Sequence, residues 1–146
     1  MPLAPKRNQD GEVVAHNDPA IDDASMLIRY INVREHVIYD ENLRRRRISS
    51  AAFSASSGDP NFGMSVDLGQ LLAEGGLSES ARVPAGMGAV KLQVGPVRSL
   101  NLRVGSDQSR ANKYHGQVWD VKSGKRSKLH KLVLDWVAPI DDVTLR

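Results

Sequence analysis

Apolar and polar residues alternate in two stretches in the second half of the chain, and this alternation predicts two β-strands. A period of two places one face of each strand on a core and the other face in water. Gly95-Pro96 separates the stretches, and because Pro96 pushes Gly95 into extended geometry we expect a sharp bend there. The apolar positions are Val90, Leu92 and Val94, then Leu100, Leu102 and Val104.

An apolar stretch over residues 26–33 is compatible with a helix or a strand, and we favour a short helix followed by an extended turn. Residues 36–39 favour a strand, residues 40–42 have turn chemistry, and a returning strand over Arg45–Ile48 would complete a hairpin. Consecutive arginines exclude burial of that strand on both faces, so we expect it at an edge or rim. Together with the hairpin-type signal at 88–104, this favours antiparallel pairing over a parallel sheet.

Two further helices are expected. Asp67 is a good N-cap for a helix over residues 68–74, because its carboxylate can accept hydrogen bonds from the first-turn amides, and Gly75-Gly76 ends that helix. A second helix begins near Ser123 or Gly124 and stops at Ala138-Pro139. Its apolar stripe consists of Leu129, Leu132, Val133 and Trp136.

The elements predict an α+β fold, with a small, mainly antiparallel sheet and two or three helices packed on one face. Residues 114–121 add a short strand, and residues 54–63 and 105–113 form loops. Residues 1–17 are polar, contain two prolines and show no periodicity. We therefore expect a flexible N-terminal arm over 1–17 and a single α+β domain over 18–146.

The composition is that of a globular protein with few aromatic residues. The chain has 146 residues, of which 40% are hydrophobic and 5% aromatic, so aliphatic residues must supply most of the core. It has no cysteine, which excludes disulfides and cysteine nucleophiles and fits a reducing cytoplasm. Residues 1–7 lack the apolar region of a secretory signal, and no apolar run approaches the roughly 20 residues that span a bilayer. We expect a soluble, cytoplasmic protein without a membrane partner.

Basic residues are concentrated in two clusters. The net charge of +3 is small, but four consecutive arginines occupy positions 44–47. Guanidinium groups match phosphates and carboxylates, so these clusters predict contact with an anionic partner, either nucleic acid or an acidic protein surface. The alternative is two solvated basic faces. The candidate anion-binding residues are Arg44, Arg45, Arg46, Arg47, Lys125, Arg126 and Lys128.

Catalytic signals are sparse. Ser49 and Ser50 follow the arginines, but no nucleophile elbow surrounds them, and such hydroxyls more often satisfy backbone groups at a strand end. His115 lies in a polar loop that enters a strand, where a general acid/base could sit. His16, His36 and His130 complete a set of four histidines that matches no compact zinc pattern. Since no P-loop, dinucleotide fingerprint or EF-hand loop is present, we expect no cofactor and no metal.

Three segments resemble a family of small uncharacterised bacterial proteins. They are Arg47-Ile48-Ser49-Ser50-Ala51-Ala52-Phe53, then Ser65-Val66-Asp67, then Asn112 through His115 to Val118. The resemblance extends over about residues 26–136 and implies a bacterial, cytoplasmic origin. It implies no activity and no ligand.

These observations support three functions in order of preference. The first is a binding module whose arginine-rich hairpin contacts an anionic partner. The second is an interaction subunit of a bacterial assembly, such as a toxin–antitoxin or phage-defence operon. The third is a small enzyme on a phosphorylated or nucleotide-like substrate, with His115 as acid/base and Ser49 or Ser50 orienting the anion; it requires His115 to share a cleft with the arginines. The oligomeric state stays open.

Overall fold

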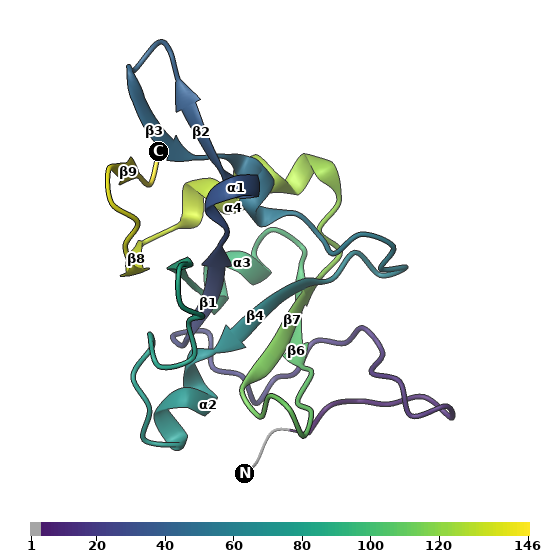
Figure 1. Ribbon diagram of the computed structural model, residues 1–146. Helices are drawn as coiled ribbons and strands as arrows, with labels where there is room; N and C mark the ends of the chain where they lie inside the picture. Colours follow the sequence, from purple (N-terminus) through teal and green to yellow (C-terminus); the bar gives the residue numbers. More distant parts are fainter. Residues whose placement is uncertain (1–3) are drawn as a thin grey trace.

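The protein combines a six-stranded sheet and a three-stranded sheet with short helices (Figure 1). The computed structural model describes residues 4–146. The large sheet has the order β6-β7-β4-β1-β5-β8, and every pair of neighbours in it is antiparallel. Its strands are β1 Met26–Ile31, β4 Met64–Leu68, β5 Gly88–Gln93, β6 Arg103–Ser106, β7 His115–Trp119 and β8 Asp135–Ala138.

The small sheet has the order β2-β3-β9, with β2–β3 antiparallel and β3–β9 parallel. Its strands are β2 Val37–Asp40, β3 Arg45–Ile48 and β9 Val143–Thr144. The helices are α1 Val33–His36, α2 Gly69–Glu74, α3 Val94–Arg98 and α4 Arg126–Leu132, with 3₁₀ turns η1 Ser50–Phe53 and η2 Ser123–Lys125. This arrangement confirms the predicted α+β fold with a mainly antiparallel sheet.

Alternating residues of the large sheet bury two separate apolar faces. Leu27 of β1 pairs with Leu68 and Leu92, and this face packs on the buried residues of α3, α4 and η1. The opposite face is smaller, with Ile28 and Ala89 packed against Leu72 of α2. Burial of one such side chain is worth about 1.5–3 kcal/mol, so the first face supplies most of the apolar stabilisation.

The apolar stretch at residues 26–31 is a strand, and the favoured helix is wrong. β1 lies between β4 and β5 and pairs with both. The hydrogen bonds to these two strands favour a strand over a helix, which the periodicity of the sequence cannot distinguish. The helix that follows is only the four residues of α1, and the side chain of Asn32 caps it by accepting from the amide of Arg34 at 2.9 Å.

The helix after β4 is confirmed, but the predicted N-cap is wrong. Asp67 belongs to β4 and is 2% exposed, and α2 begins at Gly69 without a side-chain cap. Gly76, just beyond the helix, has φ of +71°, the left-handed conformation expected of a glycine at a helix end.

The hairpin predicted over residues 88–104 is wrong. The first strand is present as β5, but Val94, Gly95 and Pro96 open helix α3. Proline fits there because a first-turn residue needs no intrahelical N–H bond. The second strand, β6, starts only at Arg103 and pairs with β7, so β5 and β6 are not neighbours.

Two further predictions, the edge position of β3 and the length of the last helix, are wrong. β3 is the central strand of the small sheet, not an edge, because β9 pairs with its open side. The last helix stops at Leu132, and Trp136 lies in β8 opposite Val90 of β5. A hydrogen bond of 3.0 Å from the amide of Leu134 to the carbonyl of Lys91 docks the chain on the sheet at the point where the helix has ended.

The segment before β1 follows the edge of the large sheet. Residues 7 and 13 form an isolated antiparallel bridge, and the amide of Asp18 donates to the carbonyl of Val104 in β6 at 2.9 Å. Within residues 4–146, the structure contains no helix with the length and apolar character to cross a membrane.

Candidate functional site

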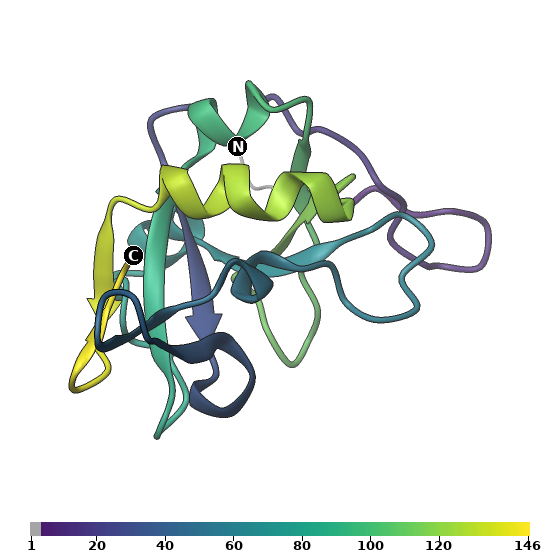
Figure 2. The same cartoon turned by 90° about the horizontal axis from the view of Figure 1, so that it is seen from above.

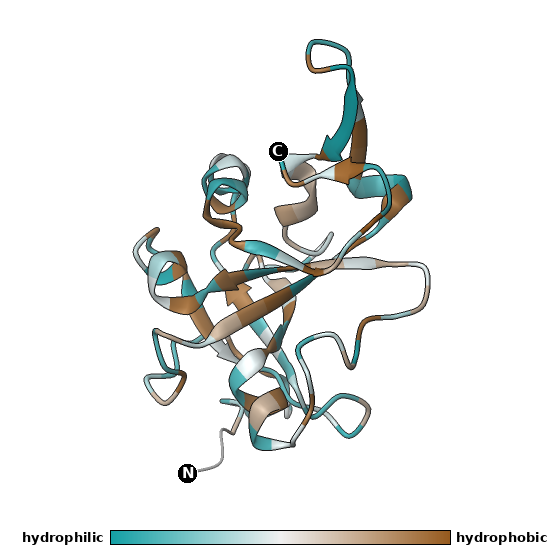
Figure 3. Ribbon diagram, turned by 90° about the vertical axis from the view of Figure 1, so that its left-hand side faces the viewer, coloured by the Kyte–Doolittle hydropathy of each residue, from teal (hydrophilic) through white to brown (hydrophobic). Residues whose placement is uncertain are grey.

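The arginine block forms the turn and second strand of a hairpin that projects from the rest of the molecule (Figures 1 and 3). Arg44 is exposed and occupies the turn with φ of 52°, a left-handed conformation that a residue with a Cβ adopts at a cost. Arg45 donates from Nη2 to the backbone carbonyl of Arg146 at 3.0 Å. The hairpin is therefore tied to the segment that carries β9.

The side chain of Arg47 forms a hydrogen bond within the hairpin, whereas that of Arg46 forms none. Arg47 donates from Nε to the carboxylate of Asp40 at 2.7 Å, and this hydrogen bond is the main reason that the pKa of Asp40 lies below its usual value. Arg46 forms no side-chain hydrogen bond or ion pair with any described residue. Across the strand pair from it lies Tyr39, which is 61% exposed, and next to Tyr39 lies Ile38, which is 40% exposed.

The second predicted cluster lies at the other end of α4 from the hairpin (Figure 2). Lys125 donates from Nζ to the carbonyl of Leu100 at 2.7 Å, so its charge is directed to a neighbouring loop. The Nε of Arg126 is buried and has no hydrogen-bond partner among the described residues. Lys128 is exposed on the outer face of the helix.

Arg146 joins the hairpin to the C-terminal end of α4 and not to the second predicted cluster. Its Nη2 donates to the carbonyls of Lys131 at 3.1 Å and Val133 at 2.6 Å, while its own carbonyl accepts from Arg45. The structure thus brings Arg45, Arg146 and Lys131 together from three segments. Sequence reasoning missed Arg146 because an arginine at the end of a polar stretch carries no local signal.

Ser49 and Ser50 occupy the join between β3 and η1. The hydroxyl of Ser49 accepts from the amide of Ala51 at 3.2 Å and caps the 3₁₀ turn, while its own amide donates to the carbonyl of His36 at 2.7 Å. Ser49 therefore has the backbone role that its position at a strand end predicts.

His115 is paired with Asp107, at a distance from the arginines. Its Nδ1 lies 3.2 Å from the carboxylate and 3.1 Å from the backbone carbonyl of Asp107. The hydrogen bond to this carboxylate raises the pKa of His115, although burial acts in the opposite direction. The loop before β7 lies at the end of the molecule opposite the hairpin (Figure 1), so His115 does not have the shared cleft with Arg44–Arg47 that catalysis would require.

A buried carboxylate lies beside His115 on the same face of the sheet. Asp67 is the register partner of His115, accepts from the hydroxyl of Tyr30, and lies 3.4 Å from the Nδ2 of Asn112. Burial raises the pKa of Tyr30 strongly, and the bond to Asp67 adds to the effect. Sequence reasoning missed this cluster because an aspartate before a leucine-rich helix has the appearance of an N-cap. It fixes two loops against the sheet.

Arg29 is a second residue that sequence reasoning missed. Its guanidinium donates from Nε to the carbonyl of Ala52 at 2.8 Å and from Nη1 to that of Ser65 at 2.9 Å. Burial lowers its pKa to about 10. Nearby, the Nδ1 of His36 accepts from the amide of Asn32 at 2.9 Å. The available signal was a single cation inside the apolar stretch 26–31.

The other two histidines pack against aromatic rings. His16 lies 5.1 Å from Trp119 between ring centroids, and His130 stacks on Phe53 at 5.4 Å. The Nε2 of His130 lies 2.7 Å from the carbonyl of Leu145, which fits an N–H donor. Within residues 4–146 no three histidine, aspartate or glutamate side chains are arranged to hold a metal ion.

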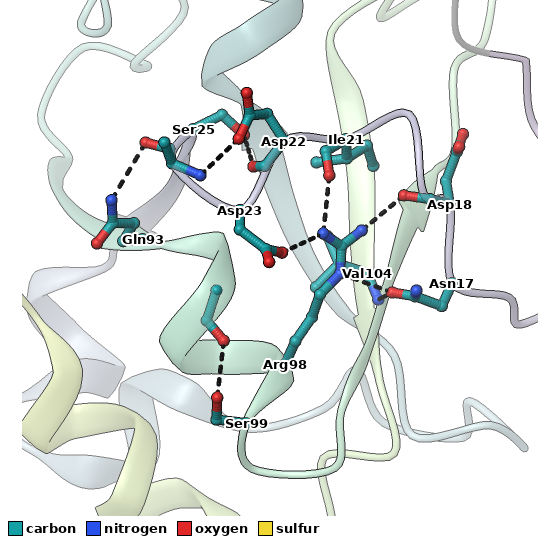
Figure 4. A network of polar contacts seen from close by, with 12 residues as sticks. Asn17, Asp18, Ile21, Asp22, Asp23, Ser25, Gln93, Arg98, Ser99 and Val104 are labelled. Carbon is teal, nitrogen blue, oxygen red and sulfur yellow. Dashed lines mark hydrogen bonds and ion pairs between the residues drawn. The ribbon is translucent and has the colours of Figure 1, made fainter.

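Arg98 is the centre of a further polar network (Figure 4). Its guanidinium donates to the carbonyls of Asp18 and Ile21 at 2.6 and 2.7 Å. It also donates to the side chains of Asn17 at 2.8 Å and Asp23 at 2.6 Å. These contacts attach the segment before β1 to α3, so the network has an evident structural role.

A cleft of about 640 Å³ lies between this segment and α2, and no residue singled out from the sequence lines it. Its floor is apolar, with Met26 and Leu72, and its rim is acidic, with Asp22, Glu74 and Glu79.

No known protein-family model matches the chain, and neither a curated protein nor a solved structure is significantly similar to it. The resemblance drawn from the three sequence segments therefore stays a prediction.

Proposed function

We propose that this protein binds single-stranded nucleic acid through the hairpin and the adjacent end of α4. The observation that carries the proposal is the pair of contacts that Arg146 makes with Arg45 and Lys131. Because both contacts are made to backbone carbonyls, they bring three basic residues from three segments of the chain close together. We call Arg44, Arg45, Arg46, Lys131 and Arg146 the basic surface.

The hairpin supports a single-stranded partner over a duplex. Tyr39 is 61% exposed and lies opposite Arg46, so an aromatic ring and a guanidinium are presented together. Unpaired bases stack on exposed aromatic rings, and such stacking is worth about 1–3 kcal/mol per base. A base stacked on Tyr39 would bring its phosphate within reach of the neighbouring arginines.

The charges around the basic surface predict moderate affinity with a strong dependence on salt. Asp40 is already paired with Arg47, whereas Glu41, Asp141 and Asp142 are exposed in neighbouring loops and reduce the local positive charge. Each phosphate neutralised on a single strand contributes about 0.7 to the slope of log affinity against log salt. Three or four engaged cations therefore give a slope of roughly 2–3.

Charge reversal tests the proposal. The Arg45→Glu/Arg46→Glu double variant should lose at least tenfold in affinity for a fluorescent single-stranded RNA or DNA, measured by anisotropy at several salt concentrations. Tyr39→Ala should weaken single-stranded binding while leaving the salt slope unchanged, because it removes stacking without removing charge.

Arg110→Glu/Lys113→Glu is the matched control, since it makes the same change of charge on exposed residues of the loop before β7. Equal losses in the two double variants, or binding that ignores salt, would count against the proposal. Circular dichroism of each variant excludes unfolding as the cause.

A protein-interaction subunit is the second candidate. It is favoured by the exposed apolar side chains of the same hairpin, with Ile38 at 40% and Leu43 at 48% exposure. Co-purification from a bacterial lysate treated with nuclease would support it if a protein partner is lost with the Ile38→Asp/Leu43→Asp variant but kept with Tyr39→Ala.

A further inference from the structure

Arg29 is a partly buried cation without an acidic partner. It lies on central strand β1, and its guanidinium donates to the carbonyls of Ala52 and Ser65. Within residues 4–146 it forms no ion pair, and its Nη2 donates to no described residue. Burial of an unpaired charge costs free energy. A partly buried guanidinium that has N–H groups without acceptors is therefore suited to bind an anion.

Arg29 lines a cavity of about 420 Å³ at the base of the hairpin. The cavity lies between α1, η1 and the loop that follows η1. It has room for a small oxyanion together with several waters, since one water occupies about 30 Å³ of liquid. We call it the Arg29 pocket, and it is lined by Arg29, Glu35, His36, Ala51, Ser54, Ala55, Ser56 and Ser57.

Two further groups of the pocket, on His36 and Ser57, can donate hydrogen bonds to a ligand. Because the Nδ1 of His36 accepts from the amide of Asn32, the neutral ring carries its proton on Nε2. Ser57 is exposed, and its hydroxyl donates to no described residue. The carboxylate of Glu35 is on the exposed rim and does not pair with Arg29. An arginine fork, an imidazole N–H and a hydroxyl are the donor set of a phosphate site.

We propose that the Arg29 pocket binds the phosphate of a phosphate monoester, through Arg29, His36 and Ser57. The group comes from a small molecule or from the 5′ end of a nucleic acid, and the two sources share the same chemistry. The site does not depend on the basic surface, because the residues that form it are distinct.

An NMR titration of the full chain tests the proposal. The first probe is inorganic phosphate, and the second is a 5′-phosphorylated oligonucleotide compared with the same sequence bearing a 5′-hydroxyl. The ring resonances of His36 report on the site, because burial and then the positive charge of Arg29 lower the pKa of this histidine. A bound anion offsets the charge of Arg29, so saturation should raise the pKa of His36.

Arg29→Gln should weaken the response at least tenfold. Arg34→Gln is the matched control, because Arg34 is an exposed neighbour on α1 that does not line the pocket. Ser57→Asp adds a carboxylate at an exposed lining position and should block the response without altering the core, which keeps the test valid if Arg29→Gln fails to fold.

A saturable response to inorganic phosphate that needs Arg29 supports a small-molecule ligand. A response confined to the 5′-phosphorylated oligonucleotide supports a nucleic-acid end. A non-saturable response, or one equal in the Arg29→Gln, Ser57→Asp and Arg34→Gln variants, overturns the proposal. The Arg45→Glu/Arg46→Glu variant should retain the phosphate response, so failure of the basic surface and failure of the pocket are separable.

Discussion

His115 holds its imidazole against the carboxylate and the backbone carbonyl of Asp107. The carboxylate favours the protonated ring, so the pKa of His115 is raised above its ordinary value despite burial. Burial tends to raise the pKa of Asp107 in turn, but the hydrogen bonds from His115 and Gln117 outweigh it and the pKa is lowered. A histidine that stays charged nearer to neutral pH is the result.

Replacement of Asp107 by asparagine should lower the pKa of His115 toward 6.5, as measured by NMR titration of the ring. A raised pKa stabilises the fold below pH about 6.5, and this stability is lost as the pH rises through the folded-state value. The destabilisation caused by Asp107→Asn should therefore be larger at pH 5.5 than at pH 8.5, by less than about 1 kcal/mol because solvent screens the pair.

Asp59→Asn is the control for this experiment. Asp59 lines the same cleft as Asp107, and its Oδ1 accepts from the amide of Asn61, a role that an asparagine oxygen can keep. An unchanged pKa of His115 in Asp107→Asn, or an equal change in Asp59→Asn, would contradict the assignment.

At the scale of elements, Arg98 joins α3 to the segment before β1 (Figure 4). Its guanidinium donates to two backbone carbonyls and two side chains, which uses the planar fork that a lysine lacks. The side chain thereby positions residues 17–23 at one end of the sheet.

The Arg98→Lys variant should lose at least two of these hydrogen bonds and destabilise the protein by about 2–4 kcal/mol in urea unfolding. Hydrogen exchange should become faster at the amides of Ile21 and Ser25, which form turns within the segment. Exposed Arg110→Lys serves as the comparison. Unchanged protection of these amides in Arg98→Lys would show that the segment is held by other contacts.

Local patterns predicted the elements whose partners are close in sequence. The hairpin of β2 and β3 was recognisable because strand, turn and strand residues follow one another within 37–48. The distant pairings were not recognisable. Whether residues 26–31 form a helix or a strand depends on β4 and β5, and the arrest of the last helix before Trp136 depends on its pairing with β5.

The same limit applies to the candidate site. The arginine block was visible because its residues are consecutive, whereas Arg146 acquires its place through contacts with Arg45 and Lys131, 101 and 15 residues away. Arg29 was detectable in the sequence, because a single cation within an apolar strand is costly to bury and indicates a specific role. Its pocket could not be read from the sequence, because residues 54–57 reach it through a loop.

At the scale of the whole molecule, residues 143–146 contribute to the stability of the small sheet. β9 pairs with β3 in parallel, Val143 is buried, and Arg146 is bonded to the end of α4. The hairpin thus depends on a strand that lies almost 100 residues further along the chain.

Removal of residues 143–146 should loosen the hairpin while the large sheet stays intact. We expect faster hydrogen exchange in β2 and β3, unchanged protection in β1 and β5, and weaker binding of single-stranded nucleic acid. The point variant Arg146→Gln keeps β9, so it should reduce the salt slope of binding by less than about 1 and change exchange in the hairpin less than the truncation does. Uniform loss of protection after the truncation would mean that the two sheets unfold as one unit.

The segment that runs along β6 has a consequence for how copies of this protein behave toward one another. Its amide at Asp18 and its side chain at Asn17 bond to the carbonyl and amide of Val104 on the outer strand. An uncovered strand edge is a template for pairing with another chain. The segment covers the edge of β6 at Val104, so we expect its removal by a protease to leave this strand edge open to pairing with another chain.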